Sequence, residues 1–395
     1  MKIYQVNVTG RFSTGIICNQ IHRELLDRSY ESRFVFGLGG ETDQNRIEMN
    51  DIWHQRLDSR FQRYFGKEGV FAGHSTDRII NDIIAFCPDL IHIHNIHGNF
   101  LNIEKFLKFL AEYGAPVVLT LHDCWAFTGG CFHFTVNGCY EWKKNCTNCK
   151  FIAKKNHPEN DYKIKSELFG QIKDLSVITV SKWLKGVASE SLLGSREISV
   201  IYNGIDTEIF HPVVTDFKNK IGCPDKKIVL GVASSWGKRK GLDKWIQLSE
   251  ILEEEYKIVL VGVNEKQKKN IPERIIALPR VGKQSDLAEL YSIADVYVNM
   301  SQEETFGLPT VEAMSCGTPS VVFNTTANPE LIEKGTGIVC KDTSIESIKN
   351  AIHEICENPK EHWRSMCRSY AVNNFSYKKM TDSYIDYYTK IMAWR

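Results

Sequence analysis

Short apolar runs alternate with longer segments of helical periodicity along almost the whole chain of 395 residues. Several of these runs are continuously apolar, which is typical of parallel strands that are buried on both faces of a sheet. The runs predicted to be strands are 2–8, 89–95, 116–122, 176–181, 198–203, 227–233, 256–262, 295–300 and 319–324.

Apolar positions between these runs recur at helical spacing, so that strands and helices follow each other in turn. This alternation predicts an α/β fold. The positions that share a helix face are Ile17, Ile21 and Leu25, then Trp245, Leu248 and Leu252, and near the end of the chain Met380, Tyr384, Tyr387 and Ile391.

A break between two α/β blocks is predicted near Gly204, because Asn-Gly and His-Pro interrupt the pattern within 201–214. A chain of this length also exceeds one ordinary core. We therefore expect an N-terminal domain over 1–203 and a C-terminal domain over 204–377, both doubly wound and Rossmann-like. The carboxyl ends of their strands, the usual ligand-binding edge, would face a central cleft.

The composition argues against several classes of protein. The 49 basic side chains balance 48 acidic ones, and the formal net charge of +1 provides no field that would attract nucleic acid. The first fifteen residues lack the apolar core of a secretory signal, and no apolar stretch reaches membrane-spanning length. We therefore expect a cytoplasmic protein whose twelve cysteines are reduced.

The loop 301–323 carries the sharpest candidate chemistry. Leu308 with the following proline is typical of a helix start, so Glu304 would precede this helix and Glu312 would lie in its first turns. Carboxylates beside the positive end of a helix suggest a ligand that is both hydroxylated and phosphorylated. An acidic helix start that caps itself would produce the same pattern.

Two further strand-to-helix loops have features of phosphate sites. The loop 231–245 places Arg239 and Lys240 ahead of a helix, as a diphosphate clamp or an ordinary basic turn would. The loop 9–16 holds Gly15, which would let a ligand approach the backbone closely. Neither loop contains a Walker motif or a dinucleotide-binding fingerprint, so the usual signals for ATP hydrolysis and NAD chemistry are missing.

Histidines gather where two predicted strands end. His122 and Asp123 would bring an imidazole and a carboxylate to the ligand-binding edge, unless His122 is an ordinary structural histidine. His92 and His94 would share one face of their strand while His97 would point away, which disfavours a metal site there.

Four cysteines, Cys131, Cys139, Cys146 and Cys149, lie within nineteen residues. The last two form a C-x2-C pair, which is a good half-site for zinc, but the spacing of the first two is not diagnostic. A structural zinc ion and reduced, packed cysteines are equal alternatives here, ahead of a disulfide or an iron–sulfur role.

These motifs together resemble one known family. The run from Glu304 to Glu312 is similar to the E-x7-E motif of GT-B retaining glycosyltransferases of family 4, and 303–323 match that family's signature. The resemblance extends over essentially the whole chain. The stretch 122–131 with the cysteines after it is similar to bacterial enzymes that build O-antigen, capsule and colanic-acid-type exopolysaccharide. The GT-B fold also implies a last helix, about 378–395, that packs back on the N-terminal domain.

The resemblance implies roles for individual residues. Glu304 would hold hydroxyls of the donor sugar, Lys240 would neutralise the departing diphosphate, and His122 would contact the donor sugar or the acceptor. Glu312 would bind the ribose hydroxyls. The remaining donor-side residues that the resemblance implies are Gly15, Arg239, Arg280, Phe306, Gly307 and Leu308, and the acceptor-side residues are Asp123 and His97.

The implied reaction moves a sugar from a UDP-, GDP- or dTDP-sugar to a hydroxyl of a lipid-linked oligosaccharide, with retention of configuration. No cofactor would be required, and the chain indeed lacks an Asp-x-Asp sequence. The chain departs from the family at Ser234, where an arginine is common. The alternatives are a non-catalytic protein that binds nucleotide sugars or glycans, and a GT-B epimerase.

A lipid-linked acceptor would place the protein at the inner face of the cytoplasmic membrane. Residues 142–155 contain five lysines together with Trp142 and Phe151, a composition that suits an anionic, interfacial surface. An ordinary basic surface loop would have the same composition.

Overall fold

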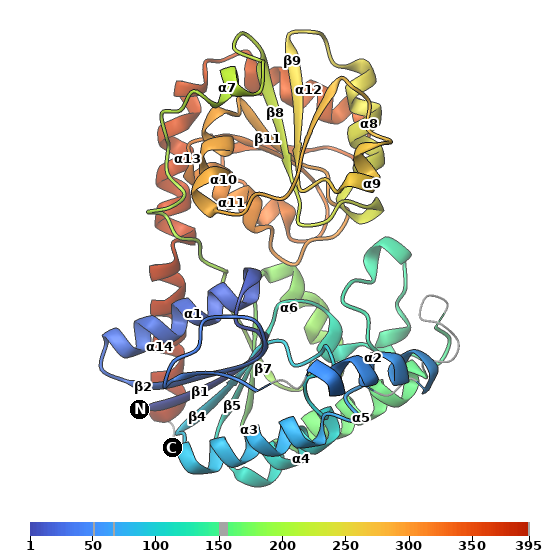
Figure 1. Cartoon of the computed structure of the whole chain (residues 1–395), viewed down its shortest axis with the longest axis vertical. Coiled ribbons are helices and arrows are strands. Elements are labelled where there is room, and N and C mark those ends of the chain that lie inside the picture. The colour runs from blue at the N-terminus through green and yellow to red at the C-terminus, as the bar shows by residue number, and fades with distance from the viewer. Residues whose placement is uncertain (50–51, 66–67, 150–156, 394–395) are drawn as a thin grey trace. The chain divides into compact units, whose positions relative to one another are not determined.

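The computed structural model describes residues 1–49, 52–65, 68–149 and 157–393 (Figure 1). Its internal contacts divide the chain into unit 1, which is Met1–Tyr202 with Thr381–Arg395, and unit 2, which is Asn203–Met380. Each unit is built around one parallel sheet with helices on both faces, which is the α/β arrangement that the alternating pattern predicts.

Unit 1 contains a seven-stranded sheet in the order β3-β2-β1-β4-β5-β6-β7. Its strands are β1 Lys2–Thr9, β2 Glu31–Leu38, β3 Arg46–Glu48, β4 Leu90–Ile93, β5 Val117–Leu121, β6 Leu175–Thr179 and β7 Glu197–Val200. Its helices are α1 Phe12–Asp27, α2 Ile52–Phe65, α3 Gly73–Phe86, α4 Ile103–Tyr113, α5 Pro158–Gln171, α6 Lys182–Ser189 and the last helix of the chain, α14 Tyr377–Ala393, which starts in unit 2.

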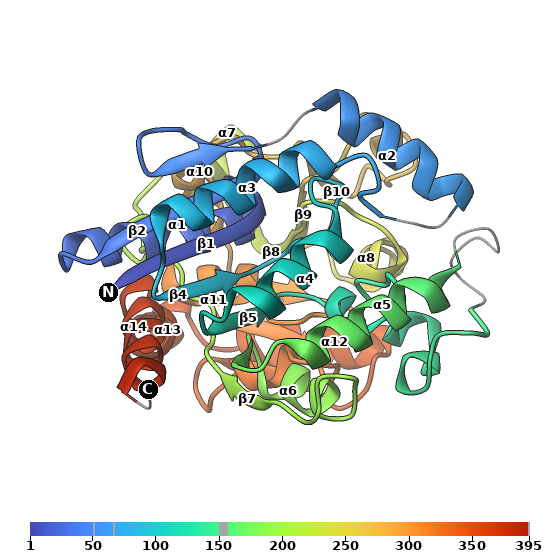
Figure 2. The same ribbon diagram turned by 90° about the horizontal axis from the view of Figure 1, so that it is seen from below.

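Helices cover both faces of the sheet in unit 1. α3, α4 and α5 lie side by side on one face (Figures 1 and 2). α1 packs against β1 and β2, and α14 reaches β4 and β5 through its tyrosines. Local sequence sets the helix ends: Asn102 caps α4 by accepting a hydrogen bond from the Lys105 N–H, and Gly114 ends it at a positive φ of 81°.

Unit 2 contains a six-stranded sheet in the order β10-β9-β8-β11-β12-β13. Its strands are β8 Lys227–Val232, β9 Tyr256–Val261, β10 Ile275–Leu278, β11 Val296–Asn299, β12 Ser320–Phe323 and β13 Gly337–Cys340. Its helices are α7 Phe217–Lys220, α8 Leu242–Ile251, α9 Glu265–Lys268, α10 Gln284–Ile293, α11 Leu308–Ser315, α12 Ile345–Cys356 and α13 Lys360–Phe375. α8 and α12 share one buried apolar cluster with the sheet, while α10, α11 and α13 pack together elsewhere in the unit.

The prediction of strands from apolar runs found the edge strand β7 as well as buried strands, and it missed β2, β3, β10 and β13 among the described residues. β3, β10 and β13 lie at sheet edges, and their residues are mostly half-exposed. β3 contains Arg46 and Glu48, whereas β10 and β13 are apolar segments of only four residues each. β2 begins with Glu31, Ser32 and Arg33 before its apolar part. No helix among the described residues is long and apolar enough to cross a membrane.

The buried stripe of the last helix differs from the predicted one. Met380 and Tyr384 are buried as expected, but Tyr387 is only partly buried, and Tyr388 is fully buried in its place. The reason is that Tyr388 lies four residues after Tyr384, where its hydroxyl contacts His92 on β4. The correction matters because Tyr388 belongs to a polar cluster beneath His122.

Candidate active site

The candidate residues of unit 2 follow two adjacent strands, β8 and β11, from which the sheet is extended in opposite directions. Ligands of open α/β sheets bind at the carboxyl ends of strands at such a switch point. The loop after β8 contains Lys240, and the loop after β11 contains Glu304. The topology therefore brings together residues that are 64 positions apart.

Gly241 sets the position of Lys240. Residues Lys238–Lys240 form a single 3-10 turn, and Gly241 ends it with a positive φ of 71°. A Cβ at this position would lie only 2.8 Å from the Met300 carbonyl oxygen at the end of β11, so the two loops touch through the glycine. This contact places the Lys240 ammonium beside the loop after β11.

Lys240 and Glu304 form an ion pair between Nζ and Oε1, and both side chains are largely buried. Arg239 donates from Nη1 to the Glu303 carbonyl oxygen at 2.9 Å and so supports the same loop. Burial raises the pKa of the Glu304 carboxyl, but the charges of Lys240 and Arg239 outweigh it and hold that pKa below its usual value. Glu304 is therefore an ionised acceptor at neutral pH.

α11 begins as predicted, with Gly307 at a φ of 110° as its cap and a proline in its first turn. Glu312 accepts a hydrogen bond at Oε2 from the Tyr291 hydroxyl, with 2.8 Å between the oxygens. Burial raises the pKa of the Glu312 carboxyl to about 7, and the bond from Tyr291 lowers it only in part. Glu304 in the loop and Glu312 on α11 thus have opposite pKa shifts.

The other predicted donor-side residues of unit 2 differ in exposure. The Phe306 side chain is buried and packs edge to face on Phe375, with ring centroids 5.8 Å apart, so its backbone is the part that is left for a ligand. Leu308 is half-exposed at the start of α11. Arg280 is exposed just after β10.

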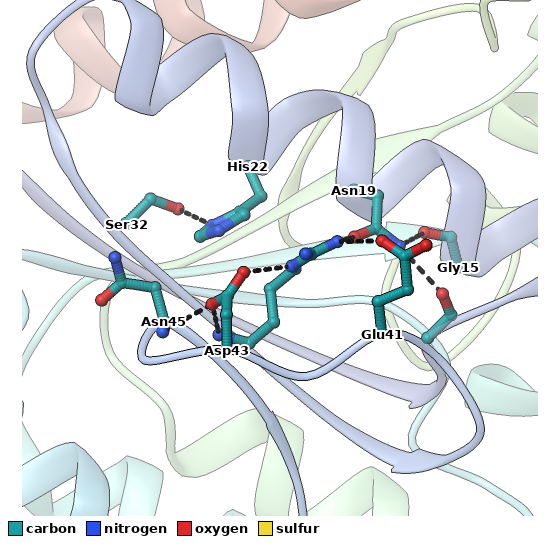
Figure 3. A network of polar contacts seen from close by, with 9 residues as sticks. Gly15, Asn19, His22, Ser32, Glu41, Asp43 and Asn45 are labelled. Carbon is teal, nitrogen blue, oxygen red and sulfur yellow. Dashed lines mark hydrogen bonds and ion pairs between the residues drawn. The ribbon is translucent and has the colours of Figure 1, made fainter.

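Gly15 lies in the first turn of α1, where the helix crosses the end of β1. A Cβ there would lie 2.6 Å from the Gly10 carbonyl carbon and 2.8 Å from the Thr9 oxygen, so packing within unit 1 already requires glycine. Asn19 donates to the carbonyl oxygens of Gly10 and Gly15, both at 2.8 Å, and Figure 3 shows this amide at one end of a polar network that extends to Asp43. This loop is thus rigidly held.

His122, Asp123 and His97 lie together at the carboxyl ends of β4 and β5, as the edge argument requires. His97 Nε2 lies 3.3 Å from Asp123 Oδ2, and the Trp125 N–H donates to Asp123 Oδ1 at 2.8 Å. Burial alone would raise the pKa of Asp123, but the bonds from His97 and Trp125 bring it below its usual value. Burial lowers the pKa of His122 to about 4, so this ring is neutral at physiological pH.

His92 and His94 share one face of β4, as predicted, with ring centroids 3.8 Å apart. His94 Nδ1 lies 3.0 Å from His122 Nε2. His92 contacts the Thr120 and Tyr388 hydroxyls at 2.8 and 2.6 Å. Among the residues that the structure describes, no three His, Cys, Asp or Glu side chains are arranged to hold a metal ion.

Cys131, Cys139, Cys146 and Cys149 line one small cavity together with Phe134 and Trp142, so the fold gathers all four. Cys146 Sγ accepts a hydrogen bond from the Gly129 N–H at 3.2 Å, and none of the described cysteines forms a disulfide. The side chains as they stand are not arranged around a metal position. Structural zinc therefore stays a prediction, to be decided by metal analysis.

The prediction of a membrane-facing surface over 142–155 is wrong for Trp142. Trp142 is 2% exposed and packs against Phe127 and Phe134, so it cannot reach a lipid interface. Lys143 is exposed but forms an ion pair with Glu190. The lysines at 150, 154 and 155 and Phe151 lie outside the described residues.

Tyr291 was not singled out from the sequence, and His94 was considered there only as a metal ligand, not as a partner of His122. Tyr291 and His94 each contact a candidate residue, but through chain separations of 21 and 28 residues. Both residues carry a polar group in or next to a buried element, and buried polar groups have hydrogen-bond partners. Tyr291 lies on the buried side of α10, and His94 directly follows the fully buried strand β4.

With this geometry in hand, the fold can be compared with known proteins. Two parallel Rossmann-like sheets of seven and six strands define the GT-B class, and the similar solved structures are GT-B proteins. Residues 16–209 match the model "Glycosyltransferase Family 4", and residues 213–373 match "Glycosyl transferases group 1". The chain therefore belongs to the glycosyltransferases, with a family 4 domain followed by a group 1 domain.

Individual relatives are distant. The chain is 26% identical over 231 residues to N-acetyl-alpha-D-glucosaminyl L-malate synthase of Bacillus anthracis, a match that covers 55% of the chain and 60% of that relative. It is 24% identical over 420 residues to the putative colanic acid biosynthesis glycosyl transferase WcaC of Escherichia coli, which covers 99% and 100% of the two chains. The structure of HepE of Anabaena in complex with UDP-glucose has a TM-score of 0.66 at 16% identity, with 99% and 100% covered.

Proposed function

We propose that the protein transfers a sugar from a nucleotide-sugar donor to a hydroxyl of an acceptor glycan, with retention of configuration and without a catalytic metal. The observation that carries the proposal is the arrangement at the switch point of unit 2, where Lys240 pairs with Glu304 and Glu312 lies on α11, the helix that follows the same loop. It offers a cation for a diphosphate and two carboxyl groups for hydroxyls, which is the chemistry of a nucleotide sugar. The UDP-glucose complex of the similar HepE structure supports this donor class.

In this proposal, Lys240 stabilises the negative charge that develops on the diphosphate as the glycosidic bond breaks. Glu304 is ionised and accepts hydrogen bonds from hydroxyls of the donor sugar. Glu312 binds the ribose hydroxyls, and the residues around Gly307 and Arg280 line the rest of the donor site. The diphosphate oxygen would take the proton of the attacking hydroxyl, since no further carboxylate is assigned as a nucleophile.

Unit 1 would hold the acceptor and present His122 to the reacting sugar, with Asp123 and His97 on the acceptor side. The full-length similarity to WcaC, a putative colanic acid biosynthesis glycosyl transferase, supports a role in bacterial surface polysaccharide synthesis. The acceptor in this proposal is a lipid-linked glycan. We therefore place the protein in the cytoplasm, at the inner face of the membrane where such an acceptor would lie.

The test is a panel of UDP-, GDP- and dTDP-sugars with detection of released nucleoside diphosphate, in the presence and absence of a chelator. Lys240→Ala should lower kcat by at least 100-fold, because it removes a charge that acts mainly in the transition state. Lys238→Ala is the matched control, since Lys238 lies exposed in the same turn, and it should stay within about 3-fold of wild type.

Loss of folding must be separated from loss of chemistry. Lys240→Ala leaves the buried Glu304 carboxylate without its partner, which costs about 3–5 kcal/mol of stability, whereas Lys240→Met with Glu304→Gln removes both charges at lower cost. A folded double variant without transfer supports the site. Near-wild-type transfer in folded Lys240→Ala contradicts it, and donor binding without any product would favour a binding protein.

A further inference from the structure

A buried cluster of polar side chains lies beneath His122 on the face of the sheet that α14 covers. In the register of the sheet, His92 is level with Val118, so Thr120 and His122 lie on the same face of β5, two and four residues further on. His92 is thereby brought to Thr120, and His94 to His122. His92 and His94 are 0% and 2% exposed, and His122 is 8% exposed.

The contacts within this cluster fix the rings. His92 is held from both nitrogens, by Tyr388 at 2.6 Å and by Thr120 at 2.8 Å. Its ring packs against that of His94, with centroids 3.8 Å apart. His94 in turn stacks on His122 at 5.3 Å and an interplanar angle of 19°, and shares one hydrogen bond with it.

That single hydrogen bond selects a tautomer. Neutral imidazoles carry one proton each, so either His94 Nδ1–H donates to His122 Nε2, or His122 Nε2–H donates to His94 Nδ1. In the second case the proton of His94 sits on Nε2, a buried atom that no hydrogen-bond acceptor reaches among the residues the structure describes. A buried N–H group without an acceptor is rarer in proteins than a buried acceptor without a donor. The arrangement in which His94 Nδ1–H donates to His122 Nε2 is therefore favoured.

We propose that His94 is a positioning residue for His122, which it holds by donating from Nδ1 to Nε2 so that the proton of His122 stays on Nδ1. The proposal rests on the proposed function for the part that His122 plays in transfer. Burial keeps His92 and His94 uncharged, so the donor is a neutral ring and adds no charge next to the reacting sugar. His94 itself need not touch either substrate.

The test compares His94→Asn with His94→Leu, whose new side chains have the same number of heavy atoms and the same branching at Cγ. An asparagine amide can take the place of Nδ1–H, whereas leucine fills the buried space without a donor. We expect His94→Leu to lower kcat by about 10- to 100-fold with a nearly unchanged KM for the donor, and His94→Asn to recover most of that loss. A purely structural role would favour leucine, because the site is buried.

A second readout does not depend on activity. The 15N shifts of labelled histidine report the tautomer of His122, whose signal is assigned by its loss in His122→Gln. We expect wild type and His94→Asn to show protonated Nδ1, and His94→Leu to show a mixture of tautomers. Tyr388→Phe is the control for loosening of the cluster: it should lower Tm and leave the tautomer of His122 unchanged.

An unchanged tautomer in His94→Leu, or equal losses of kcat in the two His94 variants, would overturn the proposal. Failure of the proposed function looks different. If folded His122→Ala retains transfer, the role of His122 in the reaction is wrong, while the 15N shifts still decide whether His94 fixes its tautomer.

Discussion

The raised pKa of Glu312, which accepts a hydrogen bond from Tyr291, predicts a pH dependence of donor binding. Burial raises the pKa of Glu312 to about 7, so about half of the carboxyl groups are ionised at neutral pH. An ionised carboxylate accepts hydrogen bonds from two ribose hydroxyls, whereas a protonated carboxyl has one oxygen that carries a proton and needs an acceptor for it. Affinity for the nucleoside diphosphate should therefore rise with pH through about 7 and level off above it.

Tyr291→Phe removes the group that stabilises the ionised form. A hydrogen bond to a charged group contributes about 1.5–3 kcal/mol, which corresponds to about 1–2 pKa units. The pKa of Glu312 should rise to about 8–9 in the variant. The ionised fraction at pH 7 then falls from about one half to about 0.1–0.01, and affinity by about 5- to 50-fold. The loss should nearly vanish at pH 9.5, where both proteins are largely ionised.

The measurement is titration calorimetry of the nucleoside diphosphate from pH 6 to 9.5. The phosphate groups of the ligand ionise identically with every variant and cancel in the ratio of variant to wild type. Tyr297→Phe is the matched control, because Tyr297 is also fully buried, with its ring 5.8 Å from that of Tyr291, but bonds to Thr310 instead. Parallel pH profiles for wild type and Tyr291→Phe, or an equal shift in Tyr297→Phe, would refute the reasoning.

Three further predictions concern stability and the cysteines. Gly15→Ala should lower the free energy of unfolding by about 1–3 kcal/mol in denaturant titrations, because its Cβ would meet backbone atoms within 3 Å. Gly186→Ala on α6 should instead raise it by about 0.5–1 kcal/mol, because a Cβ there meets nothing within 4 Å. Equal effects of the two substitutions would contradict this account. Burial lowers the pKa of His22 from 6.5 to about 4, so between pH 6.5 and 4 the unfolded chain binds a proton that the folded protein does not. Relative to His22→Asn, wild type should therefore lose up to about 3 kcal/mol of stability as the pH falls from 6.5 to 4, and none above 6.5. A stability difference between the two proteins that stays constant with pH would exclude this linkage. Metal analysis of purified protein decides between the two alternatives for the cysteines: about one zinc per chain, lost on Cys146→Ser with Cys149→Ser, indicates a thiolate site, and essentially no zinc indicates packed thiols.

The features that the sequence predicts well are local ones. A glycine and a proline within a few residues indicate the helix start at Leu308. Short runs that are apolar, or that alternate apolar and polar residues, indicate the strands β1, β4, β5, β8, β9, β11 and β12. The position of Lys240 also follows locally, since Gly241 is the next residue. The edge strand β13 escapes prediction although three of its four residues are apolar, because so short an apolar run does not distinguish a strand from a buried helix segment.

The partners of the candidate residues could not be predicted in the same way. His94 reaches His122 only because β4 and β5 are neighbours in one particular register, and a single sequence does not reveal strand order or register. Tyr291 reaches Glu312 only because α10 and α11 pack together. A tyrosine on a helix and a histidine at the end of a strand are each common, so the sequence around Tyr291 and His94 does not identify the residue that each of them contacts.

The state of each ionisable group depends on such partners as well. Glu304 and Glu312 are the same residue type in one motif, yet Lys240 and Arg239 lower the pKa of the first while burial raises that of the second. One loop therefore provides a permanent anion and, eight residues later, a carboxyl group that titrates near neutral pH. The spacing of the motif predicts that both face the ligand. The ion pair with Lys240 explains why Glu304 can accept hydroxyls at any physiological pH, and burial, which the hydrogen bond from Tyr291 offsets only in part, explains why Glu312 can do so only in part.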